Sequence, residues 1–131
     1  MLSVDLAISD CGGQVVVALR GELDVMDAEA VAAALAAAAD RGNVVVVDLA
    51  GLTFIDASGL AALVRARLHA RGTGGDLLLA APQRQVLRVL ALTRQAGAFS
   101  LHADVAEAIG STGGSAAVTA IPVLPALLPA T

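Results

Sequence analysis

Two short runs rich in β-branched residues near the start of the chain indicate paired strands. Val4–Ser9 and Gln14–Arg20 are rich in β-branched and other apolar residues, and the turn-forming residues Asp10-Cys11-Gly12-Gly13 separate them. This pattern predicts an antiparallel hairpin with a four-residue loop.

A helical pattern and then a continuous apolar run follow the hairpin. The alanine-rich stretch Asp27–Arg41 has acidic residues in its first turn and ends before a glycine, which predicts a helix capped by Asp24 or Asp27. The run Val44–Leu49 begins with four valines and does not alternate with polar residues. Such a run is typical of a central strand that is buried on both faces.

Helices and strands alternate in the second half of the chain. The segment Ser58–Arg71 predicts a helix whose apolar face carries Leu60, Leu63, Val64 and Leu68. Four further elements are expected: a buried strand at 76–80, a helix from Pro82 with Val86, Leu87, Leu90 and Ala91 on its apolar face, a strand near 99–101 and a helix near 104–109. The prediction is an α/β fold with a mixed central sheet of about four to five strands, in the order β-β-α-β-α-β-α-β-α, and helices packed mainly on one face.

Composition divides the chain into one domain and a tail. Residues 1–110 have the length of a single compact domain. Residues 111–131 are uncharged and rich in Gly, Ser, Ala and Pro, so we expect a disordered tail; packing against the domain and contact with a partner are the alternatives. Prolines interrupt its apolar stretch, which is too short to span a bilayer.

Charge and residue usage exclude several classes of function. The net charge is −4, lysine is absent, and Phe54 and Phe99 are the only aromatic residues, so direct binding of nucleic acid is not expected. Cys11 has no second cysteine with which to form a disulfide and is expected to be an inert packing residue. The chain starts without a basic, apolar leader, and we therefore expect a cytoplasmic protein without membrane insertion.

Catalytic and metal-binding patterns are also missing from the sequence. His69 and His102 have no further ligand at the spacing of a metal site. The chain has no GxxxxGK phosphate loop and no nucleophile paired with a base. We expect a protein that is not an enzyme and has no cofactor of its own.

The segment Asp56-Ala57-Ser58-Gly59 carries the most information, because it leads from a buried strand into a helix. Ser58 or Asp56 can cap that helix, and capping alone would explain a serine here. A helix N-terminus also favours an added phosphate, Gly59 would give a kinase close access, and Asp24 and Asp56 are candidates for holding the hydroxyl or a Mg²⁺ ion supplied with ATP.

Two motifs in the correct order resemble the STAS domain of the anti-sigma-factor antagonists over residues 1 to about 110. Gly21-Glu22-Leu23-Asp24 is similar to the G-E-L-D segment of that family, and Asp56-Ala57-Ser58-Gly59-Leu60 is similar to its D-S-S-G-L segment. The second serine of that motif is the phosphorylation site of the family, and Ser58 occupies its position. Ala57 replaces the first serine.

The resemblance implies a partner-switching role in transcription regulation and stress response. The unphosphorylated protein would bind an anti-sigma factor Ser/Thr kinase and free a sigma factor; the kinase would then phosphorylate Ser58 with its own ATP and Mg²⁺ and release the protein, which a phosphatase would reset. We expect a monomer or a weak dimer. The expected partner-binding residues are Asp24, Asp56, Ala57, Ser58, Gly59, Ala62 and Arg65, with a solvated helix charge as the alternative for Arg65. A different hypothesis is a STAS subunit of an ABC-type membrane transport complex or a signalling scaffold, which needs no phosphate.

Overall fold

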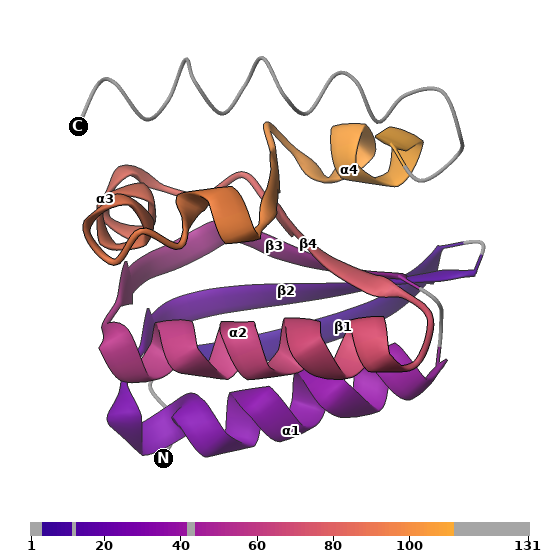
Figure 1. The fold of residues 1–131 in the computed structure, drawn as a ribbon, viewed down its shortest axis with the longest axis horizontal. Helices are drawn as coiled ribbons and strands as arrows, with labels where there is room; N and C mark the ends of the chain where they lie inside the picture. The colour runs from indigo at the N-terminus through magenta and orange to yellow at the C-terminus, as the bar shows by residue number, and fades with distance from the viewer. Residues whose placement is uncertain (1–3, 12, 42–43, 112–131) are drawn as a thin grey trace.

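The computed structural model describes residues 4–11, 13–41 and 44–111 (Figure 1), and its elements follow the expected order. The strands are β1 (Val4–Cys11), β2 (Gln14–Leu23), β3 (Val44–Ile55), β4 (Asp76–Ala80) and β5 (Ser100–His102). The helices are α1 (Val25–Arg41), α2 (Ala57–Gly72), α3 (Arg84–Leu92) and α4 (Val105–Ser111), and a 3-10 turn, η1 (Ala96–Ala98), precedes β5. The expected tail, 111–131, lies outside the described residues except for Ser111 at the end of α4.

The five strands form one mixed sheet in the spatial order β1-β2-β3-β4-β5. The β1/β2 pair is antiparallel, and every later neighbouring pair is parallel. Parallel neighbours bring their carboxyl ends to the same edge of the sheet, so the loops that follow β2 and β3 start side by side. The predicted fold class is confirmed.

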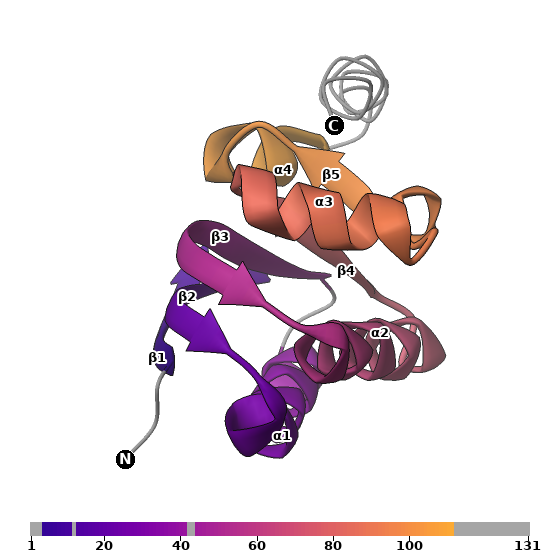
Figure 2. The ribbon, with the colours of Figure 1, turned by 90° about the vertical axis from the view of Figure 1, so that its left-hand side faces the viewer.

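The two faces of the sheet are covered unequally (Figure 2). A large apolar cluster joins alternate residues of the central strands, such as Val17 and Val47, to residues of α1, α2 and α3. A small cluster on the opposite face contains Val46 and Leu78, against which α4 packs Ala108. The helices therefore pack mainly on one face, as predicted.

The first hairpin is tighter than the sequence indicated. Pairing continues through Asp10 with Val15 and Cys11 with Gln14, so the loop shortens from four residues to positions 12–13. Gly13 has a φ of 89°, a left-handed conformation that suits a short hairpin turn and that glycine adopts without steric cost. Cys11 is a strand residue rather than a turn residue.

The central strand β3 extends six residues beyond the predicted Leu49. Its extension stays paired with β2 through irregular register, ending with Leu23 opposite Ile55. The interruption at Gly51 and the polar Thr53 hid this extension from the sequence pattern. The pairing of β3 with β4 stops at Asp48 opposite Ala80, so the end of β3 has a strand neighbour on one side only.

Candidate functional site

The two expected aspartates lie at neighbouring strand ends. Asp24 follows Leu23 of β2 and Asp56 follows Ile55 of β3, and Leu23 and Ile55 are register partners. The backbone N–H of Asp56 donates to the carbonyl of Leu23 over 3.2 Å, which ties the two ends together. The structure thus brings together the two motifs that lie 32 positions apart in the sequence.

Each aspartate begins a helix. Asp56 caps α2, and its Oδ1 accepts from the backbone N–H of Gly59 at 2.9 Å. Asp24 plays the same part for α1, where its Oδ1 accepts from the N–H of Met26 at 3.0 Å. Asp27, the other candidate cap, is buried inside the first turn of α1. Of the alternatives predicted, Asp24 and Asp56 are therefore the caps.

Ser58 is the second residue of α2 and is half-buried. Because Asp56 caps the helix, capping does not explain the serine. Within the described residues the Ser58 hydroxyl makes no hydrogen bond. The hydroxyl sits in the first turn of the helix, where the unpaired N–H groups and the positive end of the helix dipole favour a negative group.

Close packing requires glycine at position 59, a role that the sequence pattern did not indicate. A Cβ at this position would lie 2.6 Å from the carbonyl oxygen of Leu23 and 2.8 Å from side-chain atoms of Leu23 and Ile55. The glycine is buried, and so is Ala62, which is 0% exposed. Neither can contact a partner directly, because α2 turns both toward the sheet.

The other expected contact residues are accessible. Ala57 and Arg65 are exposed, whereas Asp24, Asp56 and Ser58 are half-buried. Arg65 donates to Glu29 of α1 at 2.9 Å between exposed side chains, an arrangement that contributes little to stability. This ion pair fits the interpretation of Arg65 as a solvated helix charge.

Two glutamines of the α3 region, which no sequence pattern marks, hold the free side of β3. The Gln85 side chain accepts from the N–H of Ile55 and donates to its carbonyl, each at 2.9 Å, as a neighbouring strand would. Gln83 donates to the carbonyl of Ala50 further up the strand. Gln85 therefore fixes the backbone immediately before Asp56. An isolated glutamine in an amphipathic helix gives no signal of such a role.

Large apolar side chains surround the strand ends. Val25 and Met26 begin α1, and Phe54 lies two residues before Asp56; all three are exposed, Met26 by 82%. Exposed apolar residues gathered beside polar groups mark interaction sites. We call the surface formed by Asp24, Val25, Met26, Phe54, Asp56 and Ser58 the apex.

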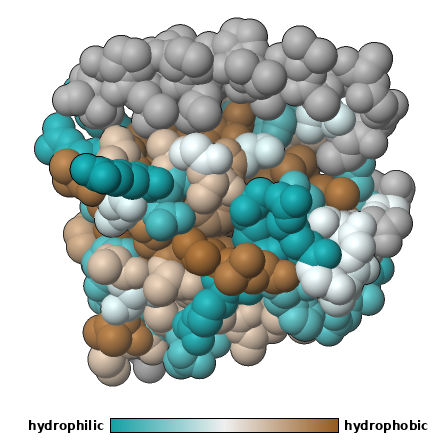
Figure 3. Space-filling model, viewed as in Figure 1, coloured by the Kyte–Doolittle hydropathy of each residue, from teal (hydrophilic) through white to brown (hydrophobic). Residues whose placement is uncertain are grey.

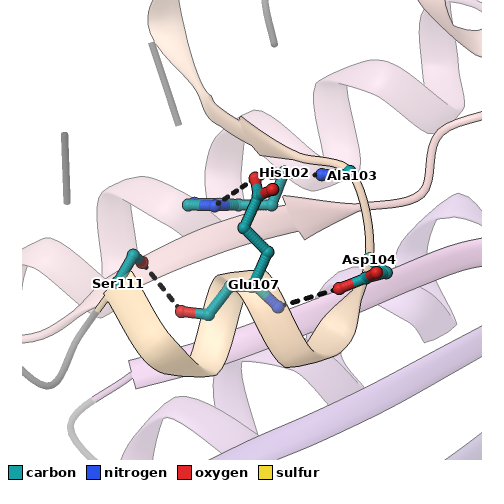
Figure 4. A network of polar contacts seen from close by, with 6 residues as sticks. His102, Ala103, Asp104, Glu107 and Ser111 are labelled. Atoms are coloured by element: carbon teal, nitrogen blue, oxygen red, sulfur yellow. Dashed lines mark hydrogen bonds and ion pairs between the residues drawn. The ribbon is translucent and has the colours of Figure 1, made fainter. Parts of the chain in front are cut away.

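A second polar cluster lies on the far face of the sheet, under α4 (Figure 4). The His102 ring is buried, and its Nδ1 lies 3.5 Å from Oε1 of Glu107. The same Oε1 accepts from the N–H of Ala103 at 3.2 Å. Burial lowers the pKa of His102 below its usual value of 6.5, and the nearby Glu107 carboxylate opposes only part of this shift. The imidazole is therefore neutral near pH 7.

Neither histidine belongs to a metal site in the described part of the chain. His69 Nε2 lies 3.0 Å from Oδ1 of Asp40 on α1, and His102 contacts Glu107. Across residues 4–11, 13–41 and 44–111, His, Cys, Asp and Glu nowhere gather in a group of three able to hold a metal ion. The same residues include no helix with the length and apolar character needed to cross a membrane.

Comparisons with known proteins agree with this geometry. The family model described as "Mlab, STAS domain" matches residues 6–102. An anti-sigma factor antagonist from Mycobacterium paratuberculosis is 26% identical, with a TM-score of 0.74 over 83% of this chain and 93% of that one. The antagonist SpoIIAA in its unphosphorylated form is 24% identical, with a TM-score of 0.72 over 84% and 97% of the two chains.

A third solved structure, a STAS domain protein from Planctomyces limnophilus described as an anti-sigma-factor antagonist, is 20% identical and has a TM-score of 0.74 over 83% of this chain and 98% of that one. No curated protein sequence matches this chain. The family model covers most of the described strands and helices, from β1 to the end of β5. The chain therefore belongs to the STAS domain family.

Proposed function

We propose that this protein is an anti-sigma-factor antagonist controlled by phosphorylation of Ser58. With Ser58 unphosphorylated, the apex binds an anti-sigma factor kinase and frees a sigma factor for transcription. Phosphorylation of Ser58 by that kinase, with ATP and Mg²⁺, releases the protein, and a phosphatase restores it. The likeness to anti-sigma factor antagonists supports this proposal, and solved structures of SpoIIAA include both unphosphorylated and phosphorylated forms.

The observation that carries the proposal is the division of labour between Asp56 and Ser58. Asp56 caps α2, so the Ser58 hydroxyl is not needed to complete the helix. A phosphate on that oxygen would face the positive end of the helix dipole, and α2 would remain folded. The site is therefore suited to gaining and losing a phosphate without unfolding.

The same geometry explains why a phosphate would release the partner. It adds a charge of about −1.5 to −2 close to the carboxylates of Asp24 and Asp56. Two unit charges about 4 Å apart interact by roughly 4 kcal/mol at an effective dielectric constant near 20, and half of that changes affinity about thirtyfold. An interface that fits the neutral hydroxyl would lose much of its affinity.

Mass spectrometry tests the phosphorylation step. The purified full chain and a Ser58→Ala variant are incubated with ATP and candidate anti-sigma kinases, followed by intact-mass and peptide analysis. The proposal predicts one added phosphate that maps to Ser58 and is absent from the variant. Phosphate on another residue, or none with any kinase that binds the protein, would contradict it.

A second candidate is a STAS subunit of a membrane transport complex of the ABC type, or a signalling scaffold, that does not depend on phosphate. The family model that matches the chain is described by its STAS domain and does not name an anti-sigma factor antagonist. Ala57 in place of the first serine of the D-S-S-G-L pattern is compatible with this role. Stable co-purification with a transporter ATPase, without any change in mass at Ser58, would favour this candidate.

A further inference from the structure

A groove runs along the exposed side of α2, next to the segment that follows α3. Its volume is about 340 Å³, and it is lined by Ala57, Leu60, Ala61 and Val64 of α2 and by Thr93 and Gln95. Figure 3 shows hydrophobic residues gathered over α2 and the surface between α2 and α3. The groove is therefore mainly apolar and open to solvent.

The apolar lining continues beyond the groove onto exposed leucines. Leu68 follows Val64 by four positions on α2 and is 63% exposed, which corrects the expectation that it packs inward with Leu60 and Leu63. Leu92, the last residue of α3, is 77% exposed and precedes Thr93 of the groove. A contiguous apolar surface of this kind is typical of an interaction site.

The part of the chain that supplies the groove carries a net positive charge, although the protein as a whole is negative. Residues 57–103 hold six of the eight basic residues of the chain and only one of its twelve acidic residues, Asp76. Arg65 lines the groove, and Arg94 lies between the lining residues Thr93 and Gln95. Arg84, Arg88 and Arg94 are exposed and form no ion pair within the described residues. The groove thus has an apolar floor beside the unpaired charge of Arg94 and the exposed ion pair of Arg65 with Glu29.

We infer that this groove, which we call the α2/α3 groove, binds an acidic amphipathic helix of a protein partner. The apolar positions of α2 repeat at intervals of three and four residues, and an amphipathic helix laid in such a groove offers apolar anchors at matching intervals. Acidic residues on the rest of that helix would face the arginines. The groove adjoins the apex, because Ala57 lines it between Asp56 and Ser58, but binding of a helix along it does not require phosphorylation of Ser58.

The charge of this chain's own segments argues against their binding in the groove in place of a separate acidic helix. Residues 112–131 contain no acidic side chain that could face the arginines. A second copy that approached through the same face would bring the same arginines, and like charges would oppose the contact. A separate acidic helix satisfies both the apolar and the charged requirement.

Two synthetic peptides test the inference on the full chain. Both are helix-forming, carry leucine at positions i, i+3, i+4 and i+7, and differ only in having glutamate or lysine on the polar face. Fluorescence anisotropy of the labelled peptides gives the affinities. We expect the acidic peptide to bind at least about tenfold more tightly than the basic one, with a difference that shrinks as salt is raised.

Variants locate the binding surface. Leu68→Ser and Arg94→Gln should each lower the affinity for the acidic peptide by about tenfold, since the first removes an apolar contact and the second removes a charge. Arg71→Gln is the matched control, because Arg71 is equally exposed and without an ion pair among the described residues but lies outside the groove. Met26→Ser controls for binding at the apex. Circular dichroism confirms that each variant is folded.

Several results would overturn the inference. Equal affinity for the two peptides would show that charge does not select the partner. If neither peptide binds, the groove is not a helix-binding site. An effect of Met26→Ser with none of Leu68→Ser would move the peptide to the apex. If sedimentation experiments show a dimer that Leu68→Ser dissociates, the groove binds a second copy of the chain instead of an acidic helix. None of these results bears on Ser58 phosphorylation, which mass spectrometry tests separately.

Discussion

The apex and the α2/α3 groove share one helix but differ in origin and in charge. The apex forms where two parallel strands end, and its carboxylates are fixed because they cap α1 and α2. The groove lies along the flank of α2, beside the ion-paired Arg65 and next to Arg94, which forms no ion pair among the described residues. The difference shows that a small domain can present an acidic and a basic surface within about two turns of a single helix.

The two surfaces also differ in how tightly their backbone is held. The apex depends on close packing at Gly59 and on the side-chain clamp from Gln85 to Ile55. The groove is lined by side chains of α2 and of the segment that follows α3, on elements that are already packed on the sheet. Changes to the apex scaffold should therefore lower the stability of the whole domain, whereas changes to the groove surface should affect binding alone.

Of the substitutions that separate the two surfaces, Gly59→Ala should lower the stability of the domain the most. The added Cβ would overlap the carbonyl of Leu23, so α2 or the end of β2 must shift. We expect a loss of about 3 kcal/mol in the free energy of unfolding, at the upper end of overpacking effects, measured by urea denaturation.

Gly72→Ala is the matched control for that substitution. Gly72 ends the same helix, and a Cβ there meets no atom within 4 Å. This variant should be neutral or slightly more stable, because alanine favours helix more than glycine does. Similar losses for the two variants would show that close packing is not why position 59 carries glycine.

Gln85→Met should have an intermediate effect on stability, with the largest local change at the apex. The change keeps the length of the side chain but removes both hydrogen bonds to Ile55, at a cost of about 1 to 2 kcal/mol. Amide hydrogen exchange at Ile55 and Asp56 should become faster than in an Arg84→Met control, which alters the neighbouring exposed residue. Unchanged exchange at these two amides would mean that Gln85 does not position the apex.

The pH dependence at His102 should be the smallest effect, and it should spare both surfaces. Because the pKa of His102 is lowered in the folded protein, the unfolded chain binds a proton first as the pH falls. The neutral His102 side chain therefore contributes fully to the free energy of unfolding above pH 6.5. This contribution is lost as the pH falls from 6.5 toward the pKa of His102 in the folded protein, by at most about 1.4 kcal/mol per pH unit.

Thermal unfolding of the wild-type protein and of His102→Gln is compared over about two pH units, from pH 7.5 to pH 5.5. The difference between the two proteins isolates the contribution of His102. The wild-type protein should lose more stability than the variant as the pH falls through that range. Parallel curves for wild type and His102→Gln would contradict the assignment.

Sequence patterns predicted the order of the elements, the mixed sheet and the convergence of Asp24, Asp56 and Ser58. These features depend on local periodicity, and the two capping motifs mark where strands give way to helices. Leu68 shows where this reasoning fails. Its helical spacing matches that of buried residues, but only the arrangement of α1 and α2 around the sheet determines which part of an apolar stripe stays exposed.

The remaining misses depend on contacts between distant segments. The full length of β3 follows from its pairing with β2, and the role of Gln85 follows from the early end of β4. Gly59 could be interpreted as a residue that opens access until its distance to Leu23 was known. Each of these features belongs to a packed pair of elements, and neither member alone carries a signal for it.

The most direct test of the proposed switch is the affinity of an anti-sigma kinase, held in its ADP-bound state, for the full chain with and without phosphate on Ser58. Isothermal titration calorimetry should show binding that is about thirtyfold weaker after phosphorylation, with Ser58→Ala close to the unphosphorylated protein. Equal affinities for the two forms would contradict the claim that phosphate at the apex releases the partner.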